Sequence, residues 1–506
     1  DVRVGMTVGD LRNEKGDVFP AKELDLTTVK VWYQNSNAWL SYFQDPKLKL
    51  CPELLLHDED LVKVDTAKKG NWARVTGKDG KTSYFWLTAP RGVHKRDVDF
   101  DAGRLDDAFA CMQEGFSDAP AFAGATLEKG KYKQFMLTAH VGRDVKPGLY
   151  EGVVAVTARE GGALLHEVPV RLRVLDFELP APKTYNDVEK DFRSMFCEYV
   201  GMMWIRCSNG NDSELAERQL EAILKDFVRH NEITPSFNDS VKYREMAKRV
   251  GMDFTDAYVG AMMCRDNADA RYAARKTARE LDRQFGSHQG MLLSWGDEYQ
   301  LHVLRAIRDM VEIYHDEGFT FAVNSQSGYA GGANLADLWW PPFSPDRHTA
   351  AKARRYNEAA PDGHMGWYAS QHAGAENPAF NRRQYGMGPY LAGLSCNYNY
   401  AHHLQGWNDT EEGLYRPMNF VYGSGNGCID TLQWEGFREG IDDIRYATLL
   451  KTTALKLIKD GSTQARYAAR LALKLLADAK DDDYDLTTFR YEMINHIQKL
   501  LAFEVR

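Results

Sequence analysis

The stretch GMLLSWGDEY at residues 290–299 decides how the rest of the chain is interpreted. Its apolar residues, from Met291 to Leu293 and at Trp295, predict a short buried strand. The strand ends at two adjacent carboxylates, Asp297 and Glu298. A helix is predicted next, because apolar residues recur at helical spacing at Leu304, Ile307, Val311 and Tyr314. Parallel α/β barrels carry their active sites at the carboxyl ends of the strands, so this order predicts a barrel with the two acids at its site.

Asp297 and Glu298 suit acid–base catalysis. Two crowded carboxylates raise the pKa of at least one of them, so that one can hold a proton near neutral pH. Acidic pairs are also common in solvated turns, and the chain has others at residues 58–60 and 316–317. The pair at 297–298 differs because it directly follows a predicted buried strand, and we therefore predict that it is catalytic.

The composition is that of a globular protein of two or three domains. The chain has 506 residues, 44% of them hydrophobic and 27% charged, with a net charge of −9. Basic residues are well mixed with acidic ones, which argues against a nucleic-acid partner, and no apolar run is long enough for a membrane span. Seven scattered cysteines give no disulfide framework. Because the sequence begins at Asp1 without an initiator methionine, we expect a processed or trimmed form. The oligomeric state cannot be read from the sequence.

Residues 1–180 predict an antiparallel β-sandwich. The clearest part is a hairpin of strands at 134–141 and 149–158, joined by a Pro-Gly turn at 143–148. A third strand at 165–174 alternates apolar and polar residues, so one of its faces is expected to be buried. Pro169 in that strand indicates an edge position or a bulge.

Residues 184–460 predict a (β/α)8 barrel, after a proline-punctuated boundary at 176–183. The eight strands are predicted at 192–203, 233–238, 254–263, 290–298, 319–325, 364–370, 392–400 and 428–433. Amphipathic helices are predicted at 215–230 and 268–285. Residues 461–506 predict helices that pack on the barrel through two apolar stripes, formed by Leu471, Leu475 and Leu476 and by Phe489, Met493, Ile497 and Leu500.

The predicted strand ends carry aromatic and amide side chains suited to a sugar. Aromatic faces pack on the C–H faces of sugar rings, and amides, imidazoles and carboxylates hold the hydroxyls. The substrate-binding candidates are Trp295, Tyr368, His372, Asn397, Tyr398, Tyr400, Trp407, Trp434 and Glu435. The alternative is structural packing: Trp367 and Trp434 in the core, Tyr398 and Tyr400 turned away from the mouth. Arg438, Glu439, Asp442 and Asp443 would then be a charged helix face.

Other site types are disfavoured by the motifs. His402 and His403 are adjacent and cannot chelate a metal from one strand face, and no zinc-type spacing is present, so we predict no metal and no cofactor. The glycine-rich stretch 423–427 lacks the Lys-Ser/Thr of a phosphate loop, and we interpret it as a βα turn. No GxSxG motif indicates a serine hydrolase.

Three parts of the chain resemble glycoside hydrolase family 123 and related uncharacterised glycosidase-like proteins. They are SWGDE at 294–298, KQFMLTAHVGRDVKPGLYEG at 133–152 with VRLRVLDFELPAPK at 170–183, and IDTLQWEGFREGIDDIRYATLL at 429–450. The resemblance implies a β-sandwich joined to a barrel, a glycan substrate and β-N-acetylgalactosaminidase activity. It also implies a secreted or periplasmic bacterial protein.

By the same resemblance, Glu298 is the general acid and then the base, and Asp297 accepts the N–H of the substrate's 2-acetamido group. The acetamido oxygen attacks the anomeric carbon and forms an oxazolinium, so no enzyme nucleophile is needed. A carboxylate on the amide N–H makes its oxygen a better nucleophile and stabilises the developing positive charge. Tyr398 or Tyr400 would steady the amide oxygen.

The chain departs from the resemblance at one residue, and two further hypotheses stand beside it. Tyr299 follows the acid pair where the resemblance leads us to expect proline, which affects the leaving-group side of the pocket. A second hypothesis is a retaining glycosidase on a non-acetamido sugar, with Glu435 or Asp409 as nucleophile. A third is a carbohydrate-binding protein without turnover.

Overall fold

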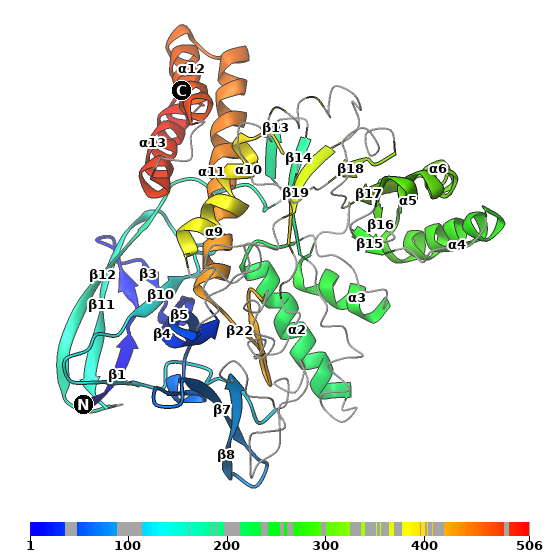
Figure 1. The fold of residues 1–506 in the computed structure, drawn as a ribbon. Coiled ribbons are helices and arrows are strands. Elements are labelled where there is room, and N and C mark those ends of the chain that lie inside the picture. Colours follow the sequence, from blue (N-terminus) through cyan, green and yellow to red (C-terminus); the bar gives the residue numbers. More distant parts are fainter. Residues whose placement is uncertain are drawn as a thin grey trace. The chain divides into compact units, whose positions relative to one another are not determined.

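The computed structural model describes most of the chain in two compact units. The described residues are 1–35, 48–88, 114–159, 161–182, 184–187, 190–196, 213–233, 241–252, 258–260, 267–294, 300–323, 335–339, 351, 355, 364–368, 377–394, 396–399, 402, 407, 419–479 and 485–504. The first unit comprises Asp1–Glu178, Met203–Ala222 and Gln405–Leu432. The second comprises Leu179–Met202, Ile223–Leu404 and Gln433–Arg506. The architecture is mixed α and β with several antiparallel sheets, and no described helix is long and apolar enough to cross a membrane (Figure 1).

Three antiparallel sheets build the first unit. One has the order β3 (Val18–Phe19), β2 (Leu11–Arg12), β11 (Gly148–Ala158), β1 (Val2–Val8) and β9 (Ala125–Leu127), with β12 (Leu164–Val174) also paired to β11. The second has the order β10 (Phe135–Ala139), β4 (Leu24–Asn35) and β5 (Leu48–Leu56). The third has β6 (Val62–Asp65), β7 (Gly70–Thr76) and β8 (Thr82–Thr88). Short 3-10 turns lie at η1 (Ala21–Glu23) and η2 (Glu59–Leu61).

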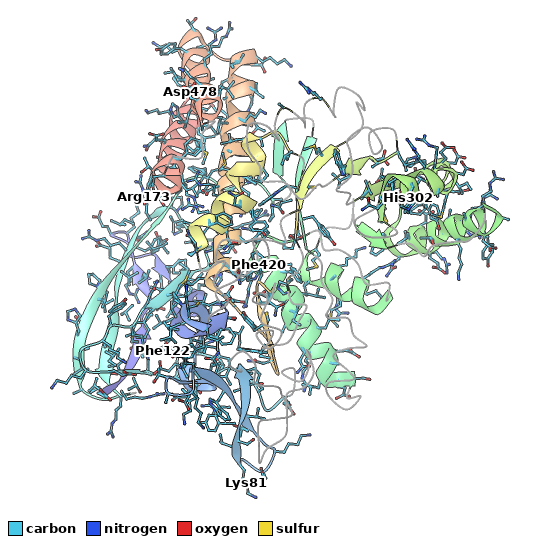
Figure 2. The ribbon with its side chains drawn as sticks, in the orientation of Figure 1. Lys81, Phe122, Arg173, His302, Phe420 and Asp478 are labelled. Carbon is cyan, nitrogen blue, oxygen red and sulfur yellow. The ribbon has the colours of Figure 1, made fainter. Side chains whose placement is uncertain are left out.

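The first two sheets share an apolar core. Leu11, Phe19, Tyr150 and Val174 of the six-stranded sheet pack together, and Leu24 of β4 and Ala139 of β10 pack against them. The two sheets therefore lie face to face, as in a sandwich. Elsewhere in the unit Phe420 is fully buried, while Lys81, between β7 and β8, is exposed (Figure 2).

The hairpin predicted from strands 134–141 and 149–158 is wrong, because these two strands do not pair with each other. β10 pairs with β4, and β11 pairs with β12. The tight turn follows Ala158, where Arg159 and Gly161 adopt left-handed φ values of 63° and 68°. The longer connection at 143–148 instead carries the chain from one sheet to the other. β12 has β11 as its neighbour among the described strands, which gives Pro169 the predicted edge position.

The predicted eighth barrel strand is also wrong. Residues 427–429 form β22 (Gly427–Ile429), which pairs antiparallel with β21 (Tyr422–Ser424) in the first unit. The glycine-rich stretch is thus the turn of a β-hairpin and not a βα turn. Gly425 donates its N–H to the carbonyl of Phe116 at 2.6 Å and accepts from Gln219 Nε2 at 2.6 Å. These bonds attach the hairpin to earlier parts of the first unit.

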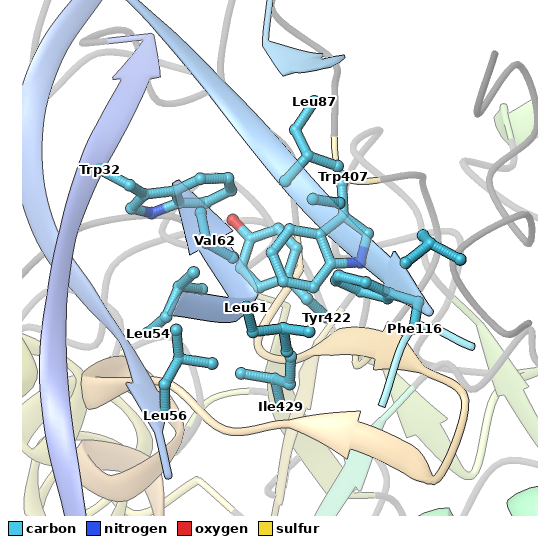
Figure 3. Packing of buried hydrophobic residues seen from close by; sticks show 12 residues of the cluster. Trp32, Leu54, Leu56, Leu61, Val62, Leu87, Phe116, Trp407, Tyr422 and Ile429 are labelled. Atoms are coloured by element: carbon cyan, nitrogen blue, oxygen red, sulfur yellow. The ribbon is translucent and has the colours of Figure 1, made fainter. Parts of the chain in front are cut away.

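An aromatic core holds the same hairpin. Tyr422 and Ile429 pack with Trp32 of β4, Phe116 and Trp407 (Figure 3). The rings of Trp32 and Tyr422 meet edge to face at 5.2 Å, and those of Phe116 and Trp407 do the same at 5.2 Å. This cluster forms the centre of the first unit together with Leu54, Leu56, Leu61, Val62, Ala73, Val75 and Leu87.

A mostly parallel sheet builds the second unit. Its order is β13 (Thr184–Asp187), β14 (Lys190–Phe196), β20 (Cys396–Asn399), β19 (His364–Tyr368), β18 (Leu338–Trp339), β17 (Thr320–Val323), β16 (Leu292–Ser294) and β15 (Tyr258–Gly260). β13 is antiparallel to β14, and the other pairs are parallel. Within the described residues the sheet is an open path from β13 to β15, so a closed barrel is not shown.

Six predicted strands correspond to described ones: those beginning at 192, 254, 290, 319, 364 and 392. β18 was not predicted, because two residues are too few to give a pattern. The strand predicted at 233–238 lies, apart from its first residue, outside the described residues.

Helices complete the second unit. They are α3 (Val241–Val250), α4 (Asn267–Phe285), α5 (Leu301–Ala306), α6 (Arg308–Asp316), α9 (Pro378–Tyr385), α10 (Met387–Leu391), α11 (Leu432–Asp460), α12 (Thr463–Asp478) and α13 (Leu486–Glu504), and α2 (Ser213–Arg229) enters the unit at Ile223. The helices predicted at 215–230 and 268–285 are confirmed as α2 and α4. The helix predicted after the acid pair is present but breaks at Ile307 into α5 and α6.

α11 approaches α9 closely through two glycines. A Cβ at Gly436 would lie 2.3 Å from the carbonyl oxygen of Pro378, and one at Gly440 would lie 2.5 Å from that of Arg382. α11 also runs beside α12 and α13 (Figure 1). The predicted stripe on α13 is buried. On α12 the prediction is wrong for Leu471, which is exposed, while Leu475 and Leu476 are half-buried and the fully buried residues are Ala465, Ala469 and Ala472.

Candidate functional site

The predicted catalytic pair follows an interior strand of the parallel sheet. β16 ends at Ser294 and has β15 on one side and β17 on the other. Asp297 and Glu298 come three and four residues later. Both lie outside the described residues, and so do Trp295, His372, Tyr400 and Asp409. The described residues therefore include the strand that precedes the acid pair, and this strand ends at the same edge of the sheet as the other parallel strands.

Two tyrosines occupy neighbouring positions at that edge. Tyr398 of β20 is the register partner of Tyr368, the last residue of β19. Asn397 turns to the opposite face of β20, because successive side chains alternate along a strand. Its Nδ2 donates to the carbonyl oxygen of Tyr385 in α9 at 2.7 Å. Asn397 was predicted to bind substrate, but its amide is engaged in holding α9 to the sheet.

The two predicted sugar-stacking tryptophans are packed on both faces. Trp407 lies in the aromatic core of the first unit, 3% exposed, and its Nε1 donates to the carbonyl of Gly423 at 2.8 Å. Trp434, in the first turn of α11, is fully buried and stacks on Phe437 with ring centroids 4.8 Å apart. Trp367 is also fully buried. The packing alternative is confirmed for Trp367 and Trp434, and Trp407, which it did not include, is packed as well.

Glu435 is held by an arginine. Arg438 donates from Nε and Nη2 to Glu435 Oε2 at 2.9 and 2.7 Å, and His230 Nε2 lies 3.6 Å from Oε1. Burial alone would raise the pKa of Glu435, but the hydrogen bond with His230 and the charge of Arg438 outweigh it and lower the pKa to about 2. The carboxylate is therefore ionised and cannot donate a proton near neutral pH. Its arginine clamp also argues against the predicted role as nucleophile.

The predicted charged face of α11 is a buried ion-pair network. Arg438 also contacts Glu439 at 3.0 Å and Asp442 at 3.3 Å. Asp443 accepts from Arg382 Nε at 2.7 Å and from Arg490 Nε at 2.6 Å. These contacts connect α9, α11 and α13, so these residues are structural, as the alternative predicted.

Sequence reasoning missed a buried aspartate. Asp226, near the end of α2, is 2.9 Å from His230 Nδ1 and accepts from Trp434 Nε1 at 2.9 Å. His402 Nε2 lies 3.5 Å from the same carboxylate, and the His402 ring stacks on Phe227 at 3.9 Å. We refer to Asp226, His230, His402 and Trp434 as the Asp226 cluster. The sequence did contain a signal for this cluster. Asp226 and His230 are four residues apart on the apolar face of the helix predicted at 215–230.

Electrostatics fix the charge of this cluster. Burial raises the pKa of Asp226, but the charge and hydrogen bond of His230, with a smaller contribution from His402, bring it well below its usual value. Burial lowers the pKa of His402, against the opposing effect of Asp226. Asp226 is therefore a carboxylate, and His402 is a neutral imidazole near neutral pH.

Comparison with known proteins supports the fold. No protein family and no curated protein matches the sequence. A family 123 glycoside hydrolase from Clostridium perfringens, studied for glycolipid glycan hydrolysis, has a similar structure, with a TM-score of 0.60 and 12% identity. The likeness covers 99% of this chain and 90% of that one. The chain therefore has a glycosidase fold.

Two further structures are much less similar. A family 2 glycosyl hydrolase from Bacteroides cellulosilyticus has a TM-score of 0.29 and 10% identity, over 79% of this chain and 49% of that one. A β-glucuronidase from Bacteroides uniformis has a TM-score of 0.30 and 10% identity, over 84% and 49%.

Proposed function

We propose that the protein is a retaining exo-glycoside hydrolase that releases terminal β-linked N-acetylhexosamine, with N-acetylgalactosamine as the preferred sugar. One observation carries the proposal: the sequence WGDEY directly follows β16, an interior parallel strand, in a chain whose fold is similar to that of a family 123 glycoside hydrolase. Active sites of parallel α/β enzymes lie at that end of the strands. The substrate would be a glycan or glycoconjugate, and the location secreted or periplasmic.

In this proposal the parallel sheet is a (β/α)8 barrel. Starting from β14, the parallel strands follow in the order β20, β19, β18, β17, β16 and β15. In a closed barrel the last strand lies beside the first, so the same order is found when the strands are counted backwards from the first. One place then remains, between β15 and β14. The strand predicted at 233–238 would occupy it and close the barrel.

The mechanism uses the substrate's own amide. Glu298 protonates the glycosidic oxygen while the acetamido oxygen attacks the anomeric carbon, and the C–O bond to the aglycone breaks. Asp297 accepts the acetamido N–H and stabilises the oxazolinium. Glu298 then removes a proton from water as the water attacks the anomeric carbon. The oxazolinium ring opens, and the product keeps the anomeric configuration of the substrate. Tyr398 is favoured over Asn397 as a group on the substrate side, because Asn397 faces α9.

The hypothesis of an enzyme nucleophile loses support. Glu435 is buried and bound by Arg438, so it is poorly placed to attack a sugar. Asp409 is the other candidate for a non-acetamido mechanism, and turnover of a plain hexoside would point to it. Any turnover removes the alternative of a carbohydrate-binding protein without activity.

The test is hydrolysis of aryl β-glycosides with and without a 2-acetamido group. We expect turnover of the acetamido sugars, with the galacto form faster than the gluco form. Glu298→Gln should lose most activity on poor leaving groups and much less on activated aryl groups, which need little protonation. Asp297→Asn should impair both. Full activity of Asp297→Asn on both substrates would refute substrate assistance through this pair.

A further inference from the structure

The Asp226 cluster connects three segments that are distant in sequence. Asp226 belongs to α2, His402 follows the last residue of β20 by three positions, and Trp434 belongs to the first turn of α11. The carboxylate of Asp226 lies within 3.5 Å of a nitrogen on each of the other two. Since β20 is one of the parallel strands, the chain that leaves it begins at the edge where the proposed reaction takes place.

We propose that Asp226 is a positioning residue for this reaction: it fixes the chain that leaves the carboxyl end of β20 by binding His402 and the start of α11 to the end of α2. The inference rests on the proposed function. Asp226 does not touch the reacting atoms in this proposal. It acts through His402, whose ring is clamped between the Asp226 carboxylate and the face of Phe227.

The chemistry requires a group that only accepts hydrogen bonds. Three ring nitrogens, of His230, His402 and Trp434, face the two carboxylate oxygens of Asp226. An ionised carboxylate can accept from each of them, and charged acceptors make the stronger bonds. An asparagine in the same place has one acceptor oxygen and one NH2 group, which would face an N–H and repel it.

The remaining partners hold His230 in place. Its Nδ1 faces Asp226 at 2.9 Å and its Nε2 faces Glu435 at 3.6 Å, and Glu435 is in turn held by Arg438. His230 also stacks on Trp434, with ring centroids 4.9 Å apart. The donors around Asp226 are therefore oriented before any substrate binds, as a positioning role requires.

The experiment compares Asp226→Asn with Asp443→Asn. Asp443 is a good control because it is also a buried carboxylate of the second unit, and its ion pairs with Arg382 and Arg490 lie on α9 and α13. Both substitutions should lower the melting temperature. Two readouts then distinguish them: amide hydrogen exchange of the peptide covering residues 396–404, and steady-state kinetics on the acetamido glycoside.

For Asp226→Asn we expect exchange in residues 396–404 to rise about tenfold, because the segment loses its anchor. We expect kcat to fall about 10- to 100-fold with a smaller change in KM, since displacement of a site edge by about 1 Å can have such an effect. Asp443→Asn should leave both readouts near wild type. Asp226→Glu, which keeps the charge, should recover part of kcat.

Three results would decide against the proposals separately. Unchanged exchange at 396–404 in Asp226→Asn overturns the inference, whatever the activity. Raised exchange with wild-type kinetics overturns the role in the reaction. A wild-type protein that hydrolyses none of the glycosides overturns the proposed function, while the exchange data still decide whether Asp226 anchors the segment.

Discussion

Each unit has an imidazole–carboxylate cluster, half-buried in the first unit and buried in the second, and the two are built in opposite ways. In the first unit one histidine lies between two carboxylates: His57 Nε2 is 2.7 Å from Asp25 and its Nδ1 is 3.2 Å from Asp118. In the second unit one carboxylate, Asp226, faces two histidines and an indole. In the first unit two carboxylates stabilise a protonated imidazole. In the second unit several ring nitrogens surround an ionised carboxylate.

The inversion gives the clusters opposite responses to pH. Burial lowers the pKa of His57, but its bonds to Asp118 and Asp25 outweigh burial and raise the pKa to about 10. The stabilisation is complete below the unfolded value near 6.5 and is lost as pH rises toward 10. In the second unit the pKa values of Asp226 and Glu435 are lowered, so their stabilisation is lost as pH falls.

The largest effect is expected from Arg438→Met. The change leaves Glu435, Glu439 and Asp442 buried or half-buried without their shared cation. Removal of one partner from a buried ion pair costs about 3–5 kcal/mol, and we expect a loss of that size in the free energy of unfolding measured with urea. Arg3→Met, which removes a partly exposed pair with Asp60, should change it by less than about 1 kcal/mol. Equal effects would mean that burial does not distinguish these pairs.

The next effect belongs to the first unit and the alkaline range. His57→Gln removes the imidazolium, and glutamine can donate to only one of the two carboxylates. Wild type should lose about 3 kcal/mol of stability between pH 6 and pH 11 that the variant does not lose, with the value reduced because Asp25 is partly exposed. Unfolding measured at both pH values gives the difference. If wild type and variant had the same pH dependence, the raised pKa of His57 would be wrong.

How far the sequence predicted this fold depends on the kind of contact. Local periodicity correctly predicted the helices α2, α4 and α13. It also predicted the strands β11 and β12, with bounds that agree to within one residue. It did not give the partner of β10, because a strand's pattern shows which face is buried but not which strand lies beside it. The strand predicted at 428–433 holds only for its first two residues, which lie in β22, because helix α11 already begins at Leu432.

The candidate site was predicted unevenly for the same reason. The order of apolar run and acids correctly identified β16 as a strand followed by a helix. Aromatic content at predicted strand ends could not separate core from sugar site, because both environments select the same residues; Trp407 and Trp434 proved to be packed. The Asp226–His402 contact spans 176 residues of sequence, and no local pattern encodes it.

The third effect belongs to the second unit and the acid range. Glu435 has a pKa of about 2, below its usual 4.5, so it stabilises the fold above pH 4.5 and this contribution is lost as pH falls toward 2. We expect Glu435→Gln to be less stable than wild type by about 2–3 kcal/mol at pH 7, and the two to converge toward pH 2. Urea unfolding between pH 3 and pH 7 tests this. A constant gap across that range would show that the residue acts through packing and not through its charge.

The smallest effect compares two buried tryptophans. Trp434 donates its indole N–H to a carboxylate, and Trp407 donates to the backbone carbonyl of Gly423. A bond to a charged group contributes about 1.5–3 kcal/mol and a neutral one about 0.5–1.5, so Trp434→Phe should destabilise by about 1 kcal/mol more than Trp407→Phe. Both changes remove similar ring volume from packed cores, and the matched pair cancels that part. If the two losses were equal, the charge of Asp226 would add nothing to its bond with Trp434, and its anchoring role would rest on His402 and His230 alone.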